Sequence, residues 1–307
     1  MTLNSKSNMV EQIAMEFLIE KRRTRRWTIF FRIFWLAIIL IIFFRASLYH
    51  SYYTTNDFTA VIDLNEIIDK NHDSANKLIA GLEAAYQHPN TKGIIIRANS
   101  PGGSPVQAGI VFDEIKRLKR QYPNIPLYTV VEDICASGCY YIACATDKIY
   151  VDKASIVGSI GVRSEGFGFV ESIKKLGIER RLYTAGDNKA MGDPFLPNNP
   201  THQLILQSLI NRIHQQFIQV VKVGRGHRLK NHPGLFSGQI YLGEEAYQLG
   251  LADGLSNARI IAENVIKAKA LKNFTIEESF INQLKKNLGG VGVSQSNLLL
   301  QNLLKIM

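Results

Sequence analysis

The sequence predicts an α/β fold, and three observations support this prediction. From residue 58 onward, short apolar runs typical of strands alternate with segments of helical periodicity. The run at 93–98, Gly-Ile-Ile-Ile-Arg-Ala, has the near-continuous hydrophobicity of a strand buried in a parallel sheet. The runs at 93–98 and 127–131 each lead into a turn of small residues and then a helical segment. This alternation is typical of parallel strands whose end loops carry function.

The expected elements can be assigned along the whole main domain. Apolar runs predict strands at residues 58–64, 93–98, 127–131, 148–151, 155–157 and 178–183. Helical patterns predict helices at residues 74–88, 105–121, 201–223 and 243–248, directly after Ser137, and from after Leu255 to about Lys272. In the first of these helices, Leu78, Leu82 and Ala85 share one face.

The N-terminal part predicts a membrane anchor. Residues 27–44 are apolar except for Thr28 and Arg32. The length of this run, 18 residues, is near the minimum for a helix that crosses a hydrocarbon layer about 30 Å thick. Residues 21–26 carry a charge of +5, which predicts a cytosolic N-terminus. No small-residue cleavage site follows the run. We therefore expect an uncleaved single-pass anchor in the inner (cytoplasmic) membrane, with the main domain on the periplasmic or extracytoplasmic side.

These features divide the chain into five parts. Residues 1–26 are a cytosolic tail with a short helix at 9–20, residues 27–44 are the anchor, and residues 45–57 are a linker. Residues 58–272 are the main domain. Residues 273–307 form a C-terminal tail, and we expect its leucine-rich end, 298–307, to be an amphipathic helix for docking between subunits.

Composition excludes several classes of function. The net charge is +10, but half of this excess lies in residues 21–26, and no basic stripe with interleaved aromatic residues indicates nucleic-acid binding. Cys135, Cys139 and Cys144 lack a CxxC spacing and a nearby histidine, so no metal site is expected. We interpret them as small buried hydrophobic residues, with Cys139 a lesser candidate for a nucleophile. Neither GxxxxGK[ST] nor GxGxxG occurs, and no cofactor is expected.

Ser137 is the first candidate catalytic residue. It stands among small residues between the strand run at 127–131 and the helical segment after it. The first N–H groups of a helix and its dipole favour developing negative charge, which suits a nucleophile. Serine is also a preferred N-cap residue. The local sequence leaves both roles open.

A serine nucleophile needs a base, and Lys189 is the better candidate. It stands among Gly186, Ala190 and Gly192 in the loop after the expected strand 178–183. A lysine acts as a base only when neutral, which desolvation favours, and a solvated surface lysine is the competing interpretation. The seven histidines fall mostly on expected helix surfaces or linkers, so we interpret them as solvated and not catalytic. They stand at positions 50, 72, 88, 202, 214, 227 and 232.

A glycine turn follows the strand at 93–98. Gly102 and Gly103 can adopt backbone angles that point N–H groups at an anion. An oxyanion donor and a plain turn both fit this pattern.

Five ordered blocks carry a family resemblance. They are Ser100-Pro101-Gly102-Gly103; Ala136-Ser137-Gly138 with Tyr140-Tyr141-Ile142-Ala143; Gly158-Ser159-Ile160-Gly161-Val162; the Lys189 loop through Pro194-Phe195; and Phe236-Ser237-Gly238 with residues 246–253. In this order, over about residues 58–271, they resemble the signal peptide peptidase A family of serine proteases. The resemblance implies a fold similar to the crotonases and the caseinolytic Clp protease, built from ββα spiral units.

The resemblance also implies roles for individual residues. Ser137 would be the nucleophile and Lys189 the general base of a Ser/Lys dyad, with Ser159 orienting the lysine. Gly103, Gly102 and Gly138 are the implied oxyanion residues. Implied partners are peptides, signal peptides among them, and further copies of the chain in a homo-oligomeric ring whose neighbouring subunits share active sites.

Two positions depart from the family pattern. Cys139 stands where the family has glycine, which puts a larger side chain beside Ser137. Residues 186–189 read Gly-Asp-Asn-Lys in place of Gly-Lys-Tyr-Lys. If Asp187 came close, it would keep Lys189 protonated, and activity would need a higher pH. Neither change removes a dyad member.

The expected function is a membrane-anchored serine endopeptidase whose activity rises with pH into the alkaline range. The alternative is a catalytically silent, membrane-tethered scaffold of the same fold. An acyl-CoA enzyme of the crotonase type is disfavoured by the expected outward orientation of the domain.

Overall fold

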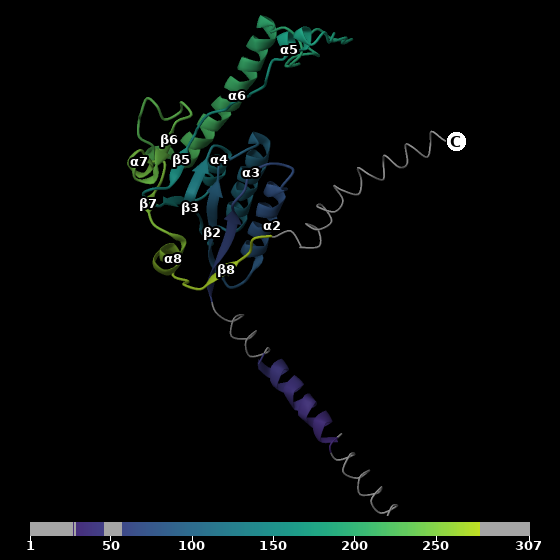
Figure 1. Ribbon diagram of the computed structural model, residues 1–307. Coiled ribbons are helices and arrows are strands. Elements are labelled where there is room, and N and C mark those ends of the chain that lie inside the picture. Colours follow the sequence, from purple (N-terminus) through teal and green to yellow (C-terminus); the bar gives the residue numbers. More distant parts are fainter. Residues whose placement is uncertain (1–26, 28, 46–56, 277–307) are drawn as a thin grey trace, which may run out of the picture. The chain divides into compact units, whose positions relative to one another are not determined.

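The computed structural model describes residue 27, residues 29–45 and residues 57–276 (Figure 1). The chain divides into two compact units, residues 1–56 and 57–307. The expected helix at 9–20, most of the expected linker at 45–57 and the leucine-rich end at 298–307 lie outside the described residues.

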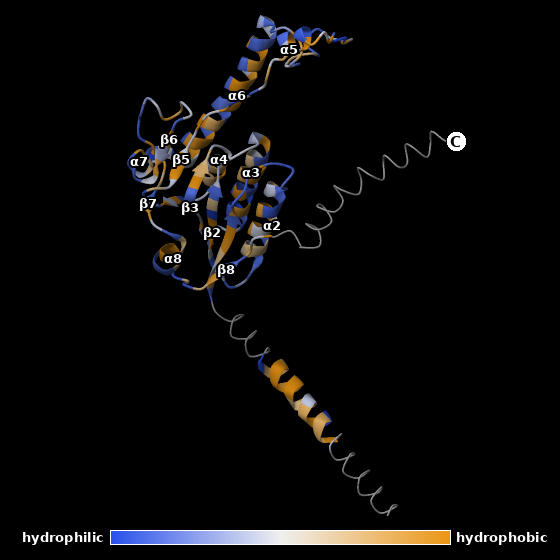
Figure 2. Ribbon diagram, in the orientation of Figure 1, coloured by the Kyte–Doolittle hydropathy of each residue, from blue (hydrophilic) through white to orange (hydrophobic). Residues whose placement is uncertain are grey.

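In the N-terminal unit, residues 29–45 form a helix of largely hydrophobic residues (Figure 2). Its large apolar side chains are exposed, among them Ile33, Trp35 and Phe43. Of the helices that the structure describes, none combines the length and hydropathy that a membrane crossing requires.

The second unit is built on one eight-stranded sheet. Its strands are β1 (Phe58–Leu64), β2 (Thr91–Ser100), β3 (Leu127–Ala136), β4 (Lys148–Val151), β5 (Ile156–Gly158), β6 (Ile240–Leu242), β7 (Gly254–Leu255) and β8 (Leu271–Asn273). The main path runs β6–β5–β3–β2–β1–β8, with β4 beside β3 and β7 beside β4. Every pairing is parallel except that of β5 with β6. This confirms the α/β class that the alternating pattern predicted.

Helices connect and cover these strands. They are α2 (Ser74–Gln87), α3 (Pro105–Gln121), α4 (Gly138–Ala143), α5 (Val170–Lys175), α6 (Pro200–Arg225), the 3₁₀ turn Gly226–Arg228, α7 (Gly243–Gln248), α8 (Ala258–Ile260) and a π-helix, Ile261–Ile266. Ser104 caps α3 by accepting the Gln107 N–H, and Asn199 caps α6 by accepting the Thr201 N–H. Pro105 and Pro200 stand at the first turns of these helices, where the absence of an N–H costs nothing.

Alternating residues of β2 face two hydrophobic cores. Ile94 and Ile96 belong to the main core, together with buried residues of α2, α3 and α4. Ile95 belongs to a smaller cluster with Val130 and Ile261. Because successive side chains of a strand point to opposite faces, the sheet is covered on both sides, as parallel sheets require.

Strand β3 has two neighbours on one edge, and this arrangement positions the site. Its residues 128–130 pair with β4, whereas residues 134–136 pair with β5. Along β2 the register is irregular, because Ala98 pairs with Val131 but Ser100 pairs with Cys135. The extra residues of β3 carry its end beyond β4 to the point where Ser137 follows.

The prediction of a strand at residues 178–183 is wrong. These residues form no strand and are exposed, with Tyr183 92% accessible. Ile178, Leu182 and Tyr183 favour strands locally, but a strand needs a neighbour to bond its backbone groups. Among the described residues, no neighbouring strand pairs with this segment.

The expected helix from Leu255 to Lys272 is also wrong in its extent. The helical segment ends at Lys267, which has a left-handed φ of 65°, and residues 271–273 form β8 beside β1. The alanines and lysines here favour a helix locally. The open edge of β1 offers backbone hydrogen bonds that outweigh this preference.

Candidate active site

Ser137 stands at a sharp corner between β3 and α4. Its backbone has φ 52° and ψ −121°, and its N–H donates to the Gly158 carbonyl at 2.9 Å. Although Ser137 occupies the N-cap position of α4, its side chain makes no capping hydrogen bond. The hydroxyl is therefore not used for the capping role that the sequence left open.

The half-buried Ser137 lines a cavity of about 690 Å³. The same cavity is lined by Ser159, Gly102, Gly103 and Gly138, which are all the predicted site residues except Lys189. Within residues 57–276, neither the Ser137 hydroxyl nor the Ser159 hydroxyl has a hydrogen-bond partner. Both are available to a bound molecule or to a base.

Two backbone N–H groups beside Ser137 are also available. A Cβ atom on Gly138 would lie 3.2 Å from the Gly103 nitrogen, so the two glycines are in close contact. Within the described part of the chain, no acceptor is bonded to the N–H of Gly103 or of Gly138. Such N–H groups can stabilise negative charge that develops on a substrate oxygen near Ser137.

The glycine turn is fixed by backbone bonds to Ile68. The Ile68 N–H donates to the Gly102 carbonyl at 2.9 Å, and the Ser104 N–H donates to the Ile68 carbonyl at 2.7 Å. Gly102 has φ 96°, and a Cβ there would lie 2.6 Å from both the Ala136 oxygen and the Gly138 nitrogen. Only glycine allows the turn to approach the Ser137 corner this closely.

Ser159 follows β5 at a second left-handed position, with φ 51°. Its N–H donates to the Gln239 carbonyl at 2.8 Å. His214 of α6 lies next to this segment, because its Nε2 contacts the Ile160 carbonyl at 3.0 Å. His214 is thus half-buried and not on a fully solvated helix surface as the sequence indicated, but it does not line the cavity.

Lys189 is exposed and lies outside this cavity. It lines a separate pocket with Arg180, Tyr183 and Phe195. The Asp193 carboxylate holds this loop together by accepting from Arg180 at 2.7 Å and from the Phe195 N–H at 2.9 Å. The hydrogen bond from Arg180 lowers the pKa of Asp193. Within one chain, the structure therefore brings five of the six predicted residues together and leaves Lys189 apart.

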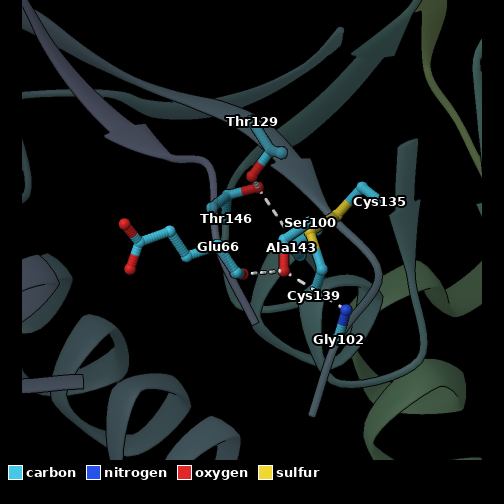
Figure 3. The surroundings of a disulfide bond; sticks show 8 residues. All are labelled: Glu66, Ser100, Gly102, Thr129, Cys135, Cys139, Ala143 and Thr146. Atoms are coloured by element: carbon cyan, nitrogen blue, oxygen red, sulfur yellow. Dashed lines mark hydrogen bonds between the residues drawn. A yellow bond between two sulfur atoms is a disulfide. The ribbon is translucent and has the colours of Figure 1, made fainter. Parts of the chain in front are cut away.

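The cysteines are buried, as predicted, but two of them form a disulfide that the sequence interpretation missed. Cys135 and Cys139 are bonded to each other on either side of Ser137, next to Ser100 and Gly102 (Figure 3). The Cys139 sulfur is therefore not a nucleophile while the bridge is intact. Cys144 is free, and burial raises the pKa of its thiol to about 12, so it is unreactive.

Residues of α6 complete the cavity and were missed in the sequence. Ile213, Gln216 and Phe217 line it, and their spacing of i, i+3 and i+4 is the signal that marked one helix face. Tyr141 of α4 packs its ring on Phe217, with centroids 5.2 Å apart. Burial raises the pKa of the Tyr141 phenol, so the ring stays neutral. The cavity thus has an apolar wall beside the hydroxyls.

The described residues offer no metal site, because no three His, Cys, Asp or Glu side chains gather within them. Their donors at the cavity are hydroxyls and backbone N–H groups, which suit acyl transfer better than metal binding.

Comparison with known proteins identifies the family. Residues 119–272, half of the chain, match the model of peptidase family S49. A putative protease of Methanocaldococcus jannaschii is 30% identical over 213 residues, which cover 69% of this chain and 67% of that protein. The chain belongs to peptidase family S49. The match includes Ser137, Ser159 and Lys189, and it confirms the family resemblance of the ordered blocks.

Two further relatives have different names. The putative signal peptide peptidase SppA of Enterococcus faecium is 29% identical over 197 residues, or 64% of this chain and 57% of that protein. The Na(+)/H(+) antiporter NhaA of Brucella abortus (strain 2308) is 45% identical over 178 residues, or 58% of this chain but 24% of the antiporter. The chain thus spans only about a quarter of the length of this antiporter.

Proposed function

We propose that this S49 family member is a membrane-anchored serine endopeptidase that uses a Ser/Lys dyad. Ser137 is the nucleophile, Lys189 the general base, and Ser159 orients the lysine. The observation that carries the proposal is the Ser137 hydroxyl, which has no capping role and shares a cavity with unpaired N–H groups of Gly103 and Gly138. A nucleophile beside preorganised oxyanion donors is the arrangement that acyl transfer needs.

The reaction follows from these groups. The Lys189 amine takes the hydroxyl proton while the Ser137 oxygen attacks the peptide carbonyl carbon. The resulting oxyanion accepts hydrogen bonds from the N–H groups of Gly103 and Gly138. The lysine then gives its proton to the leaving amine, and a water molecule hydrolyses the acyl-enzyme by the same route in reverse.

The substrates we propose are peptides with apolar side chains, such as signal-peptide remnants at the membrane. The apolar wall of Ala108, Tyr141 and Phe217 supports this class, because it can bury a hydrophobic side chain next to Ser137. A relative named putative signal peptide peptidase supports it as well.

The proposed location is the inner membrane, with residues 27–44 as the anchor and the peptidase domain on the extracytoplasmic side. The apolar run and the +5 cluster before it support the anchor and its direction. The Cys135–Cys139 disulfide supports an oxidising compartment for the domain, because cytosolic thiols are kept reduced.

We further propose a homo-oligomeric ring in which Lys189 of one subunit serves Ser137 of the next. The separation of Lys189 from the Ser137 cavity within one chain supports this arrangement. The implied ββα spiral fold of crotonases and Clp proteases belongs to the same proposal.

Labelling with a fluorophosphonate probe tests the dyad. We expect the full-length protein in detergent to be labelled at Ser137, with no labelling of Ser137→Ala and a loss of about 100-fold or more in the labelling rate of Lys189→Ala. Lys116→Ala, which removes an exposed lysine from α3, is the matched control and should label at the wild-type rate.

The alternative is a catalytically silent, membrane-tethered scaffold. An intact oligomer in which the probe does not label Ser137 would support this alternative. Labelling of Lys189→Ala at the wild-type rate would instead reject the dyad but keep the nucleophile.

A further inference from the structure

The Ser137 corner has a backbone conformation that needs support. Its angles, φ 52° and ψ −121°, are rare for any residue other than glycine. Such a conformation persists only where the surrounding structure fixes it. Two backbone hydrogen bonds contribute, from the Ser137 N–H to the Gly158 carbonyl and from the Tyr141 N–H to the Ser137 carbonyl.

The disulfide adds a covalent constraint on residues 135–139, which contain this corner. It joins Cys135 to Cys139, with Ser137 at the centre of the loop, and holds their Cα atoms 5.1 Å apart. A fully extended chain would place Cα atoms four residues apart at about 13 Å. The bridge therefore prevents the corner from opening. Both cysteines are fully buried, whereas Ser137 lines the cavity, so the bridge supports the corner from the core side.

The bridge also lies where the glycine turn meets the corner. Cys135 pairs in register with Ser100, and the Ser100 hydroxyl accepts the Gly102 N–H at 3.2 Å (Figure 3). A cross-link that closes so short a loop restrains the unfolded chain less than a long-range one would. Its main effect is thus local to Ser137 and to the N–H groups of Gly103 and Gly138.

We propose that the Cys135–Cys139 disulfide is a positioning device for Ser137, so that the peptidase works at full rate only with the bridge intact. This inference rests on the proposed function of Ser137. Reduction by a dithiol delivers two electrons and two protons, the S–S bond breaks into two thiols, and the dithiol becomes a disulfide. Ser137 can then relax towards commoner backbone angles, which moves its hydroxyl away from the oxyanion donors.

The test compares the full-length protein with Cys135→Ala/Cys139→Ala. We expect the double variant to stay folded by circular dichroism but to lose about tenfold or more in kcat and in probe labelling, with KM little changed. Cys144→Ala removes the free cysteine and is the matched control, with wild-type rates.

Chemical reduction is the second experiment. Dithiothreitol, applied for hours because the bridge is buried, should slow catalysis by the wild type and by Cys144→Ala equally, and reoxidation should restore both. The double variant should not respond.

Hydrogen exchange provides a readout that needs no catalysis. In the double variant, the amides of Ser137 and Tyr141 should lose protection, whereas those of Ile94–Ile96 in β2 keep theirs. Unchanged protection at Ser137 and Tyr141, or a folded double variant with the wild-type labelling rate, overturns the proposal. If the wild type is never labelled, the proposed function fails, and exchange alone decides the positioning role. If the double variant fails to fold, the response of the wild type to dithiothreitol decides.

Discussion

At the scale of single residues, the site depends on close backbone approach. The glycine turn lies directly against the Ser137 corner, since a Cβ on Gly102 would meet backbone atoms of both Ala136 and Gly138 at 2.6 Å. The left-handed angles of Ser137 and Gly102 together direct a hydroxyl and N–H groups into one cavity. Side chains are thus less important for the oxyanion site than the path of the main chain.

Gly102→Ala should therefore damage both stability and labelling. We expect a loss of at least about 1–3 kcal/mol in the free energy of unfolding, from the strained φ and the backbone clash, and a labelling rate lower by about tenfold or more. Gly109→Ala is the matched control, because a Cβ there meets nothing within 4 Å, and it should add about 0.5–1 kcal/mol as a better helix former in α3. Denaturant unfolding and probe labelling measure the two effects. Equal behaviour of the two variants would contradict the close packing of the turn.

The residues of the site were predictable to different degrees. Ser137, Ser159 and the glycine turn stand in ordered blocks of small residues, which the sequence displays directly. The disulfide was not predictable, because two cysteines four residues apart are bridged only if the chain reverses sharply between them. That reversal depends on the register of β3 with β2 and β5, which the local sequence does not contain.

At the scale of elements, a buried ion cluster fixes the end of α6. The Asp253 carboxylate accepts from Arg225 at 2.8 Å, from Arg228 at 2.9 Å and from the Ile149 N–H at 2.7 Å. Arg225 is 1% exposed, so its charge depends on this partner. Since Ile213, Gln216 and Phe217 lie on the same helix, the cluster also fixes one wall of the cavity.

Asp253→Asn should destabilise the fold and change its response to acid. Burial raises the pKa of Asp253, but the hydrogen bond and charge of Arg225 outweigh it and lower the pKa overall. The wild type therefore has the full stabilisation above the unfolded value of about 3.9 and loses it as the pH falls through the lower folded value. At pH 7 we expect a loss of about 3–5 kcal/mol in Asp253→Asn, and a smaller further loss in acid than in the wild type.

Denaturant unfolding between pH 7 and pH 3 measures this prediction. Glu263→Gln breaks an exposed ion pair with Lys269 and is the matched control, with no measurable change. If Asp253→Asn unfolded like this control, the cluster would not be what holds the end of α6.

Elements with a clear period were predictable, whereas elements that depend on a distant partner were not. The bounds of β1 and α3 agree with the expected residues 58–64 and 105–121, because alternation and helical periodicity are local signals. Residues 271–273 became a strand only because β1 offers an edge. Residues 178–183 have strand-forming side chains but no partner among the described strands. Pairing is a property of the fold and not of the segment.

At the scale of the whole molecule, a long part of the second unit, residues 57–307, lacks buried side chains. None of the residues from 161 to 216 is buried, although this stretch contains large apolar side chains such as Phe167, Leu176 and Tyr183. It includes α5 and about the first two thirds of α6 (Figure 1). Lys189 also lies in this stretch. Exposed apolar surface of this extent is typical of an interaction site. The proposed ring would cover it with a second copy and bring Lys189 to a neighbouring Ser137.

Mixing two inactive variants tests this arrangement. In a ring of identical head-to-tail contacts, Ser137→Ala chains still supply Lys189, and Lys189→Ala chains still supply Ser137. After subunit exchange at equal amounts, about one contact in four joins the two intact groups, so about a quarter of the wild-type peptidase activity should return. Each variant mixed with the double variant Ser137→Ala/Lys189→Ala is the control and should stay inactive.

The opposite outcome has a clear structural consequence. If the first mixture also stays inactive although exchange is shown by mass spectrometry, the serine and the lysine must pair within one chain. Lys189 would then have to reach the Ser137 cavity by a rearrangement of residues 161–199, because the two residues line separate pockets in this structure.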